Sequence, residues 1–248
     1  MQRDFKINRK QYIRLIAEKT PGNRLAYFSI ETANAEAFRR YLALKRIKVP
    51  DSISSDSDGS KGFFITDPDG TVCRIVQNPP NDELSSTDIV QAEPKQIAAR
   101  IGHVGFMVRD LDKSIRFYVG LLGFKETWRG SKNGKNLSWV NLKVPNGPDY
   151  VELMLYDKPQ SQENMGILNH VSLEVNDIYQ TEKKLDGRAL PSNCKATSSI
   201  KIGINKKRQI NSFDIDGTRI EIMEANTING IPAKSSNAKP LKFHGSRA

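Results

Sequence analysis

The sequence predicts an α+β protein built from tandem βαβββ modules that form curved mixed sheets, with an incomplete module at the N-terminus. Three observations lead to this prediction. An Asp-Gly turn leads into an alternating strand at residues 67–76 and again at 214–223. An alternating strand, a segment of helical periodicity and further strands recur in this order along the chain. The clearest copy also contains a helix stop, at residues 120–123, directly before a new strand.

Two complete copies account for residues 101–223. In the first we expect a strand at 101–108, a helix at 112–119 and strands at 124–128, 137–142 and 150–155. In the second we expect a strand at 170–175, a helix ending near 185 and strands at 200–204, 209–214 and 218–223. Alternation of apolar and polar residues predicts the strands and places one set of side chains on a packed face.

A third copy is predicted nearer the N-terminus, with a strand at 25–30, a helix at 35–45 and strands at 63–66 and 71–76. Ahead of it, Gln11–Ile16 resembles Asp149–Met154, the last strand of a module. The chain thus opens on an orphan strand, Phe5–Ile16: either the sequence is truncated or the missing strands come from elsewhere. Its exposed edge would favour pairing with a second copy of the chain, as a homodimer.

These segments divide the chain into four parts. We expect a degraded half-domain at 1–80, a linker rich in Pro, Asp, Glu and Ser at 81–99, and a complete domain at 100–225. The tail at 226–248 is expected to be mobile or wrapped over the surface.

Composition excludes several classes of protein. The 248 residues are 38% hydrophobic and 27% charged, and no apolar run approaches the roughly 20 residues of a membrane helix. No secretory signal is visible, so a cytoplasmic location is favoured, although the compartment is not decided. The net charge of +10 is scattered, so we expect no nucleic-acid partner. Cys73 and Cys194 are too few for a disulfide framework and lack metal-ligand spacing.

Four metal-competent side chains occupy matching places in the two complete copies. His103 and His170 open the first strands, and Glu152 and Glu221 lie in the last strands. Imidazole nitrogen and carboxylate oxygen suit Zn²⁺, Ni²⁺, Co²⁺ or Fe²⁺ better than Ca²⁺. We therefore predict one divalent transition metal ion in a half-apolar cavity, held by these four residues. The alternative is four unrelated polar residues on exposed strand faces.

Three segments of the complete domain carry a resemblance to a known family. Ile101–Leu111, Phe117–Phe124 and Asp216–Glu221 together resemble the vicinal oxygen chelate superfamily of glyoxalases, bleomycin-resistance proteins and extradiol dioxygenases. The resemblance covers about Ile101–Glu224 in full and Phe5–Gln77 in degraded form. It implies paired βαβββ modules around a metal. The order His, Glu, His, Glu is similar to that of glyoxalase I, which isomerises the hemithioacetal of methylglyoxal and glutathione.

The resemblance implies a metal-dependent lyase or isomerase that acts on a small carbonyl or hemithioacetal substrate through an enediolate. A carboxylate of the metal site is the base; by position Glu221 is the first choice, with Glu152 serving the opposite face. Arg109 matches an arginine used near the glutathione carboxylates, with a solvated strand end as the alternative. Lys206 and Lys207, in a basic loop, would close over an anionic substrate or form a solvated turn.

Other activities of the same superfamily stay open. Extradiol dioxygenases use two His and one Glu on Fe²⁺ together with a further acid–base His, and the one other histidine here is His244 in the tail. Epimerases of the superfamily use a similar ligand set. A non-catalytic protein that binds a metal or ligand is the third alternative.

The first half of the chain departs from the ligand pattern. Tyr27 stands where His170 stands in the later copy, and Arg14 and Arg74 stand where Glu152 and Glu221 stand. Two cations at carboxylate positions repel a divalent metal. We therefore expect this half-domain to be metal-free and to serve as a scaffold, a dimerisation surface or a remnant.

Overall fold

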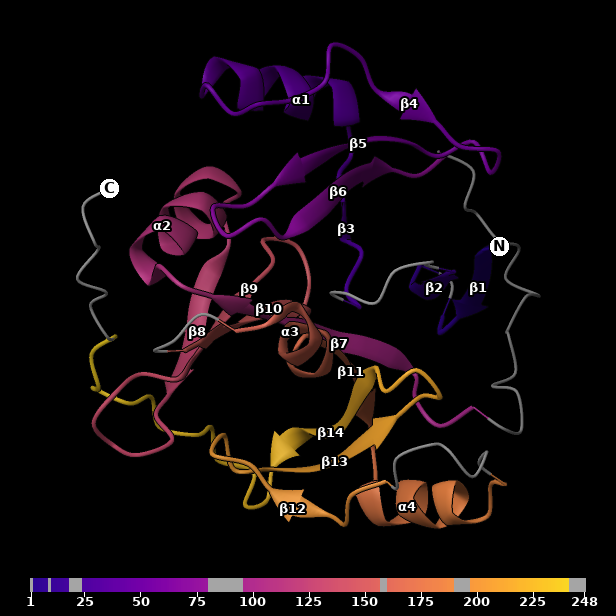
Figure 1. The fold of residues 1–248 in the computed structure, drawn as a ribbon, viewed down its shortest axis with the longest axis vertical. Helices are drawn as coiled ribbons and strands as arrows, with labels where there is room; N and C mark the ends of the chain where they lie inside the picture. Colours follow the sequence, from indigo (N-terminus) through magenta and orange to yellow (C-terminus); the bar gives the residue numbers. More distant parts are fainter. Residues whose placement is uncertain are drawn as a thin grey trace. The chain divides into compact units, whose positions relative to one another are not determined.

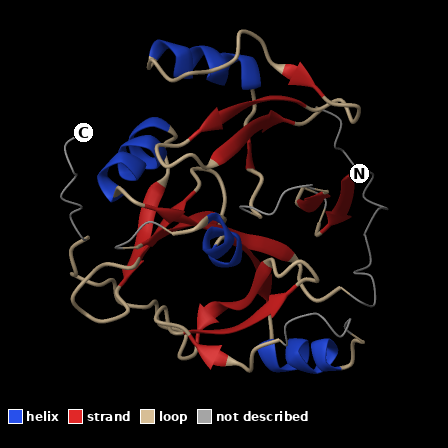
Figure 2. Ribbon diagram, viewed as in Figure 1, coloured by secondary structure: helices blue, strands red, loops and turns tan. Residues whose placement is uncertain are grey.

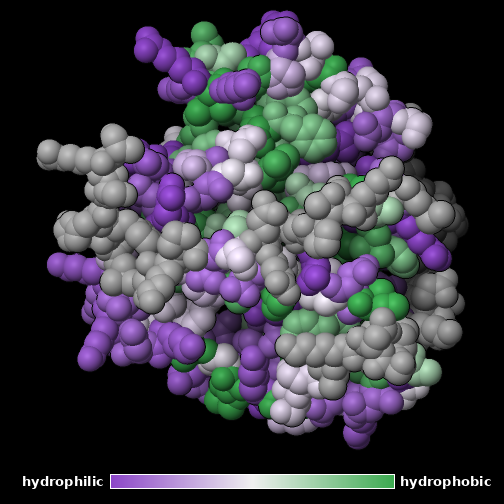
Figure 3. Space-filling model, viewed as in Figure 1, coloured by the Kyte–Doolittle hydropathy of each residue, from purple (hydrophilic) through white to green (hydrophobic). Residues whose placement is uncertain are grey.

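A computed structural model describes residues 2–8, 10–17, 24–79, 96–156, 160–189 and 197–240. The chain forms two compact units: a larger unit, Met1–Leu25 with Ala92–Ala248, and a smaller unit, Ala26–Gln91. Strands predominate and the helices are short (Figure 2). No helix within these ranges is long and apolar enough to cross a membrane. Hydrophilic and hydrophobic residues are interspersed over the coloured part of the visible face (Figure 3).

Two βαβββ copies make up most of the larger unit (Figure 1). The first contains β7 (Arg100–Val108), α2 (Leu111–Ile115) with the π-helical turn η1 (Arg116–Leu121), β8 (Lys125–Gly130), β9 (Trp139–Lys143) and β10 (Tyr150–Leu155). The second contains β11 (His170–Val175), α4 (Ile178–Asp186), β12 (Lys201–Ile202), β13 (Lys207–Phe213) and β14 (Arg219–Thr227). Helix α3 (Gln162–Leu168), which the sequence did not predict, lies between the copies.

These strands form one eight-stranded mixed sheet in the order β12-β13-β14-β11-β7-β10-β9-β8. In each copy the first strand pairs in parallel with the last, β7 with β10 and β11 with β14. The copies join where β7 pairs antiparallel with β11, so the first strands of both copies lie at the centre of the sheet. The predicted α+β fold of tandem modules in curved mixed sheets is confirmed.

Local sequence signals set the ends of the first helix. Asp110 caps α2, because its carboxylate accepts a hydrogen bond from the N–H of Lys113 at 3.1 Å. The predicted helix stop is confirmed at Gly123, which has φ of +76°, a left-handed conformation that favours glycine. The N–H of Phe124 then donates to the carbonyl oxygen of Tyr118 at 2.9 Å.

The apolar face of the sheet packs against the helices. In the second copy, Ile178 of α4 lies in a buried cluster with Leu173, Ile210 and Ile222 of the strands. In the first copy, the rings of Phe106 and of Tyr118 are 5.7 Å apart, and both side chains are fully buried. Alternation along each strand therefore turns the remaining side chains to the opposite face.

The N-terminal residues form a hairpin instead of the single orphan strand predicted at Phe5–Ile16. Strands β1 (Gln2–Lys6) and β2 (Tyr12–Ile16) pair antiparallel. The side-chain oxygen of Gln11 accepts from the N–H of Ile101 at 2.8 Å, and its amide nitrogen donates to the carbonyl of Ile101 at 3.0 Å. The hairpin is thus fixed to the start of β7, within the larger unit. Most of the predicted linker, 81–99, lies outside the described ranges.

The tail returns along the first copy of the larger unit. The N–H of Leu137 donates to the carbonyl oxygen of Lys239, and the N–H of Ser236 to that of Arg129, both at 2.9 Å. Residues 235–240 thus lie over the end of β8 and the β8–β9 connection, as a wrapped tail would. Residues 241–248 lie outside the described ranges.

The smaller unit has a βαβββ arrangement, in which the short strand β4 is one that the sequence did not predict. It contains β3 (Phe28–Glu31), α1 (Ala35–Leu44), β4 (Ser54–Ser55), β5 (Lys61–Thr66) and β6 (Val72–Gln77), in the sheet order β3-β6-β5-β4. Strand β3 pairs in parallel with β6, as the first and last strands of the other copies do.

Candidate metal centre

The four predicted ligands come together on the sheet face opposite α2 and α4. Glu152 on β10 lies opposite Gly105 on β7, which in turn lies opposite His170 on β11. In the adjacent row, Glu221 on β14 and His103 on β7 flank the same residue of β11. Directly paired residues share a face. Both rows therefore present their ligands to the same space, and all four residues are at most 8% exposed.

The ligand atoms lie at distances that fit one metal ion. His103 Nε2 is 3.1 Å from His170 Nε2 and 3.3 Å from Glu221 Oε2. His170 Nε2 is 3.7 Å from Glu221 Oε2 and 3.8 Å from Glu152 Oε2. A divalent ion with bonds of about 2.0–2.2 Å holds its ligand atoms about 3.0–3.6 Å apart. His103, His170 and Glu221 form the tightest group, and Glu152 stands slightly farther out.

A glycine makes room for one of the imidazoles. A Cβ atom at Gly105 would lie 2.1 Å from Cε1 of His170, so no other residue leaves the ring in place. His170 Nδ1 lies 2.9 Å from the carbonyl oxygen of Leu168. With the proton on Nδ1, this bond leaves Nε2 free to bind a metal.

The two histidines have different surroundings. Arg219 donates to the carbonyl of Leu168 at 2.9 Å and also contacts His170 Nδ1. His103 instead stacks on Tyr150, with ring centroids 4.6 Å apart. The second copy therefore places a cation beside its histidine, where the first copy places an aromatic ring.

The two carboxylates differ in proton affinity. Burial raises the pKa of Glu152 to about 7, against the lowering effect of His103. Burial also acts to raise the pKa of Glu221, but hydrogen bonds with His103 and His170 outweigh it and hold that pKa well below its usual value. Burial, reinforced by the charge of Arg219, lowers the pKa of His170 to about 4. His170 is thus neutral at pH 7, as metal binding requires.

Comparison with known proteins identifies the family of one domain. Residues 100–222 match the family model of the Glyoxalase/Bleomycin resistance protein/Dioxygenase superfamily. These residues, just under half of the chain, form a domain of this superfamily. A relative, the uncharacterized protein YwbC of Bacillus subtilis (strain 168), is 28% identical over 95 residues, which make up 37% of this chain and 75% of that protein.

Several solved structures share the fold of this chain at low sequence identity. The Mn(II)-bound glyoxalase from Novosphingobium aromaticivorans has a TM-score of 0.55 and 13% identity, over 86% of this chain and 67% of that one. An extradiol ring-cleaving dioxygenase from B. fuscum has a TM-score of 0.59 and 14% identity, over 87% of this chain and 59% of that one. A catechol 2,3-dioxygenase has a TM-score of 0.56 and 14% identity, over 89% of this chain and 75% of that one.

The predicted substrate-binding residues are not all near the centre. Lys207 lines a cavity of about 10 Å³ beside His103, and burial lowers its pKa. Of the four predicted ligands only His103 lines this cavity, so the half-apolar metal cavity stays a prediction. Lys206 is exposed. Arg109 is exposed and follows the end of β7, about 20 Å along the strand direction from His103. Its role near a glutathione carboxylate stays a prediction.

The sequence did not indicate two supporting residues. Gln209 on β13 donates to Glu221 Oε1 at 2.9 Å, which orients the carboxylate whose other oxygen, Oε2, faces the two histidines. Arg219 alternates with Glu221 along β14, so its place on the site face was readable from the sequence, but its contact with His170 was not. Both contacts depend on which strands are neighbours in the sheet.

The smaller unit has other residues at the matching positions. Ser29 on β3 pairs with Arg74 on β6, as Ser172 pairs with Glu221, so the predicted alignment of the repeats agrees with the strand register. Arg74 is 3% exposed, and its Nη2 lies 2.8 Å from Asp56 Oδ2. In the larger unit, Arg14 pairs with Asp4 at 2.7 Å.

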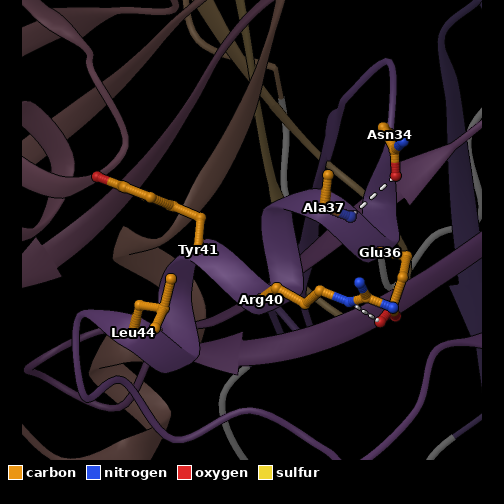
Figure 4. A pocket seen from close by; sticks show the side chains of 6 residues that line it. All are labelled: Asn34, Glu36, Ala37, Arg40, Tyr41 and Leu44. Carbon is orange, nitrogen blue, oxygen red and sulfur yellow. Dashed lines mark hydrogen bonds and ion pairs between the residues drawn. The ribbon is translucent and has the colours of Figure 1, made fainter.

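A separate hollow of about 550 Å³ runs along α1 of the smaller unit (Figure 4). Its polar groups already have partners within the helix. Asn34 caps α1 by accepting from the N–H of Ala37, and Glu36 pairs with Arg40 at 2.8 Å. Because it offers no metal-ligand cluster, we place the candidate centre in the larger unit. Its lining residues are Asn34, Glu36, Ala37, Arg40, Tyr41 and Leu44.

Proposed function

We propose that the protein is a metal-dependent lyase or isomerase of the glyoxalase type, acting on a small carbonyl or hemithioacetal substrate through an enediolate. One observation carries the proposal: two histidines and one glutamate from equivalent strands of two repeats lie with ligand atoms 3.1–3.7 Å apart, and the second glutamate, Glu152, lies 3.8 Å from His170. His103, His170 and Glu221 would hold the ion. Zn²⁺, Ni²⁺, Co²⁺ and Fe²⁺ suit this donor set. Glutathione is the thiol we expect in a hemithioacetal substrate.

The two carboxylates would divide the chemistry. When bound, the metal would polarise the oxygens of a carbonyl substrate. Glu152, with a pKa of about 7, is suited to take a proton from the carbon beside the carbonyl and to return it to the neighbouring carbon. Glu221 stays ionised and is suited to hold the metal. This reverses the order of preference from the sequence, in which Glu221 was the first choice for the base.

Two single substitutions test this division. In Glu152→Gln we expect metal affinity to fall only a few-fold, while the rate falls roughly 10²–10⁴-fold, because an amide cannot accept the proton. In Glu221→Gln we expect weakened metal binding, and the activity that remains should recover when metal is added. The role of base would return to Glu221 if Glu152→Gln kept near-normal turnover while Glu221→Gln bound metal but was inactive.

A second candidate is an extradiol-type dioxygenase. The tightest group of potential ligands is His103, His170 and Glu221, and two histidines with one carboxylate form the facial triad of non-haem Fe(II) oxygenases. The further acid–base histidine that such enzymes use has no counterpart at this centre. His244, the one remaining histidine, lies outside the described ranges.

A parallel assay separates the two candidates. Protein loaded with Zn²⁺, Ni²⁺, Co²⁺ or Fe²⁺ is offered hemithioacetals, epimerisable thioesters and catechols under air and under argon. Our proposal expects oxygen-independent turnover of a hemithioacetal or a related carbonyl compound. Oxygen-dependent cleavage of a catechol by the Fe²⁺ form, with no hemithioacetal turnover, would refute it and establish the dioxygenase.

A further inference from the structure

The first row of the centre continues outward through two more polar residues. Glu152 on β10 pairs with Asn141 on β9, and Asn141 pairs with Trp128 on β8. Directly paired residues share a face, so both lie on the same face as the ligands. Neighbouring strands are about 4.8 Å apart. Asn141 is therefore one strand and Trp128 two strands away from Glu152, within reach of a small molecule held at the centre.

Each of these residues carries a buried polar atom with no hydrogen-bond partner among the described residues. For Asn141 it is the acceptor Oδ1, and for Trp128 it is the donor Nε1. The Asn141 side chain is only 7% exposed. Buried polar groups in folded proteins are almost always paired. An unpaired acceptor and an unpaired donor on neighbouring strands therefore point to a ligand group that can satisfy both.

A glycine on β8 leaves room for the indole ring. A Cβ atom at Gly130 would lie 2.2 Å from Cη2 of Trp128. The ring therefore lies along its own strand, over Gly130. This is the second place, after Gly105, where a glycine of this face makes space for a ring.

The equivalent place in the second copy has a serine hydroxyl where the first copy has an indole. Asn211 on β13 pairs with Glu221, and its Oδ1 is also buried without a partner among the described residues. Its outer neighbour is Ser198, whose Oγ already accepts from the N–H of Asn211 at 2.8 Å. One side of the centre thus has an unpaired acceptor next to an unpaired indole N–H, and the other has an unpaired acceptor next to a serine that is already hydrogen-bonded.

We propose that Asn141 and Trp128 form a polar subsite that binds a hydroxyl group of the substrate, next to the metal-bound oxygens and on the Glu152 side. A hydroxyl donates to Asn141 Oδ1 and accepts from Trp128 Nε1–H, so one group satisfies both atoms. The substrate class is then a hydroxylated carbonyl compound. A site built to pair a hydroxyl discriminates against an analogue that lacks it, since both atoms stay unpaired. This inference rests on the proposed metal-dependent function.

Two chelators that differ by one hydroxyl test the subsite. Acetohydroxamate and glycolohydroxamate share a metal-binding group, and only the second carries a hydroxyl beside it. Binding to the Co²⁺-loaded protein is followed by calorimetry and by the visible absorption of Co²⁺. We expect the parent to bind glycolohydroxamate about tenfold more tightly, the effect of a buried hydrogen-bonding group. Asn141→Leu and Trp128→Phe should reduce this preference, with the Co²⁺ content unchanged.

Asn211→Leu is the matched control, because it removes the same group from the equivalent strand. We expect it to keep the preference for glycolohydroxamate. Equal binding of both chelators by the parent would overturn the subsite and leave the metal centre standing, as would loss of the preference in Asn211→Leu alone. If neither chelator changes the Co²⁺ spectrum, the metal centre itself is wrong, and the subsite falls with it.

Discussion

Replacing Gly105 by alanine should displace one metal ligand without changing any ligand residue. The new Cβ atom would lie 2.1 Å from Cε1 of His170 and 2.7 Å from both ring nitrogens. Carbon atoms in contact normally lie about 3.5–4.0 Å apart, so the imidazole must retreat by about 1.5 Å. Metal sites tolerate changes of only about 0.2 Å in ligand distance. We therefore expect affinity to fall by more than the roughly 10–100-fold that follows loss of an outer-shell partner.

The assay is competition with a chelator, combined with the visible spectrum of the Co²⁺ form. Gly102→Ala is the matched control, because Gly102 lies on the same strand and its new Cβ would meet the nearest atoms of Glu174 at an ordinary 3.6 Å. Denaturant unfolding of the metal-free proteins measures the stability cost, for which overpacking predicts about 1–3 kcal/mol in Gly105→Ala. Metal affinity within threefold of the parent in Gly105→Ala would refute the placement of His170.

Three further predictions concern protons, support and the smaller unit. A bound divalent cation favours the ionised form of Glu152, whose pKa is about 7. Metal binding should therefore release nearly one more proton at pH 6 than at pH 8, which calorimetry in several buffers measures. Equal proton release at the two pH values would count against that pKa. Gln209→Leu should weaken metal binding about tenfold by freeing Glu221, in the same competition assay, and unchanged affinity would deny this support. Arg74→Leu should lower the free energy of unfolding by about 1–3 kcal/mol, since it leaves Asp56 without its cation. Metal analysis of the parent protein should give one ion per chain, and a second bound ion would contradict the prediction that the smaller unit is metal-free.

Much of the fold was predictable because alternation in this chain is regular. The strands at 150–155 and 170–175 have the predicted limits, since the apolar and polar residues alternate cleanly there. Helix α3 was missed because its seven residues, Gln162–Leu168, are too few for helical periodicity to show. The β1–β2 hairpin was missed because its turn contains neither Gly nor Pro, so the two strands looked like one.

Only those residues of the candidate site that have an equivalent in the other copy could be predicted from the sequence. The His and Glu pairs stand out because each has an equivalent in the other copy. Trp128 and Gln209 have no such equivalent, and their places depend on cross-strand register between distant segments. The relative acidity of Glu152 and Glu221 depends on burial and on hydrogen bonds that only the folded chain supplies.

The arrangement of the eight-stranded sheet has a consequence for how freely its copies can diverge. In the proposed metal centre each copy of the larger unit supplies one histidine and one glutamate, so loss of either pair would disable the centre for both copies. Ligand substitutions in the two copies therefore have the same effect on the centre. The lone copy in the smaller unit has no partner in its own sheet, so a change at its ligand positions disables nothing else. An arginine, Arg74, at the position equivalent to Glu221 is compatible with this lack of constraint.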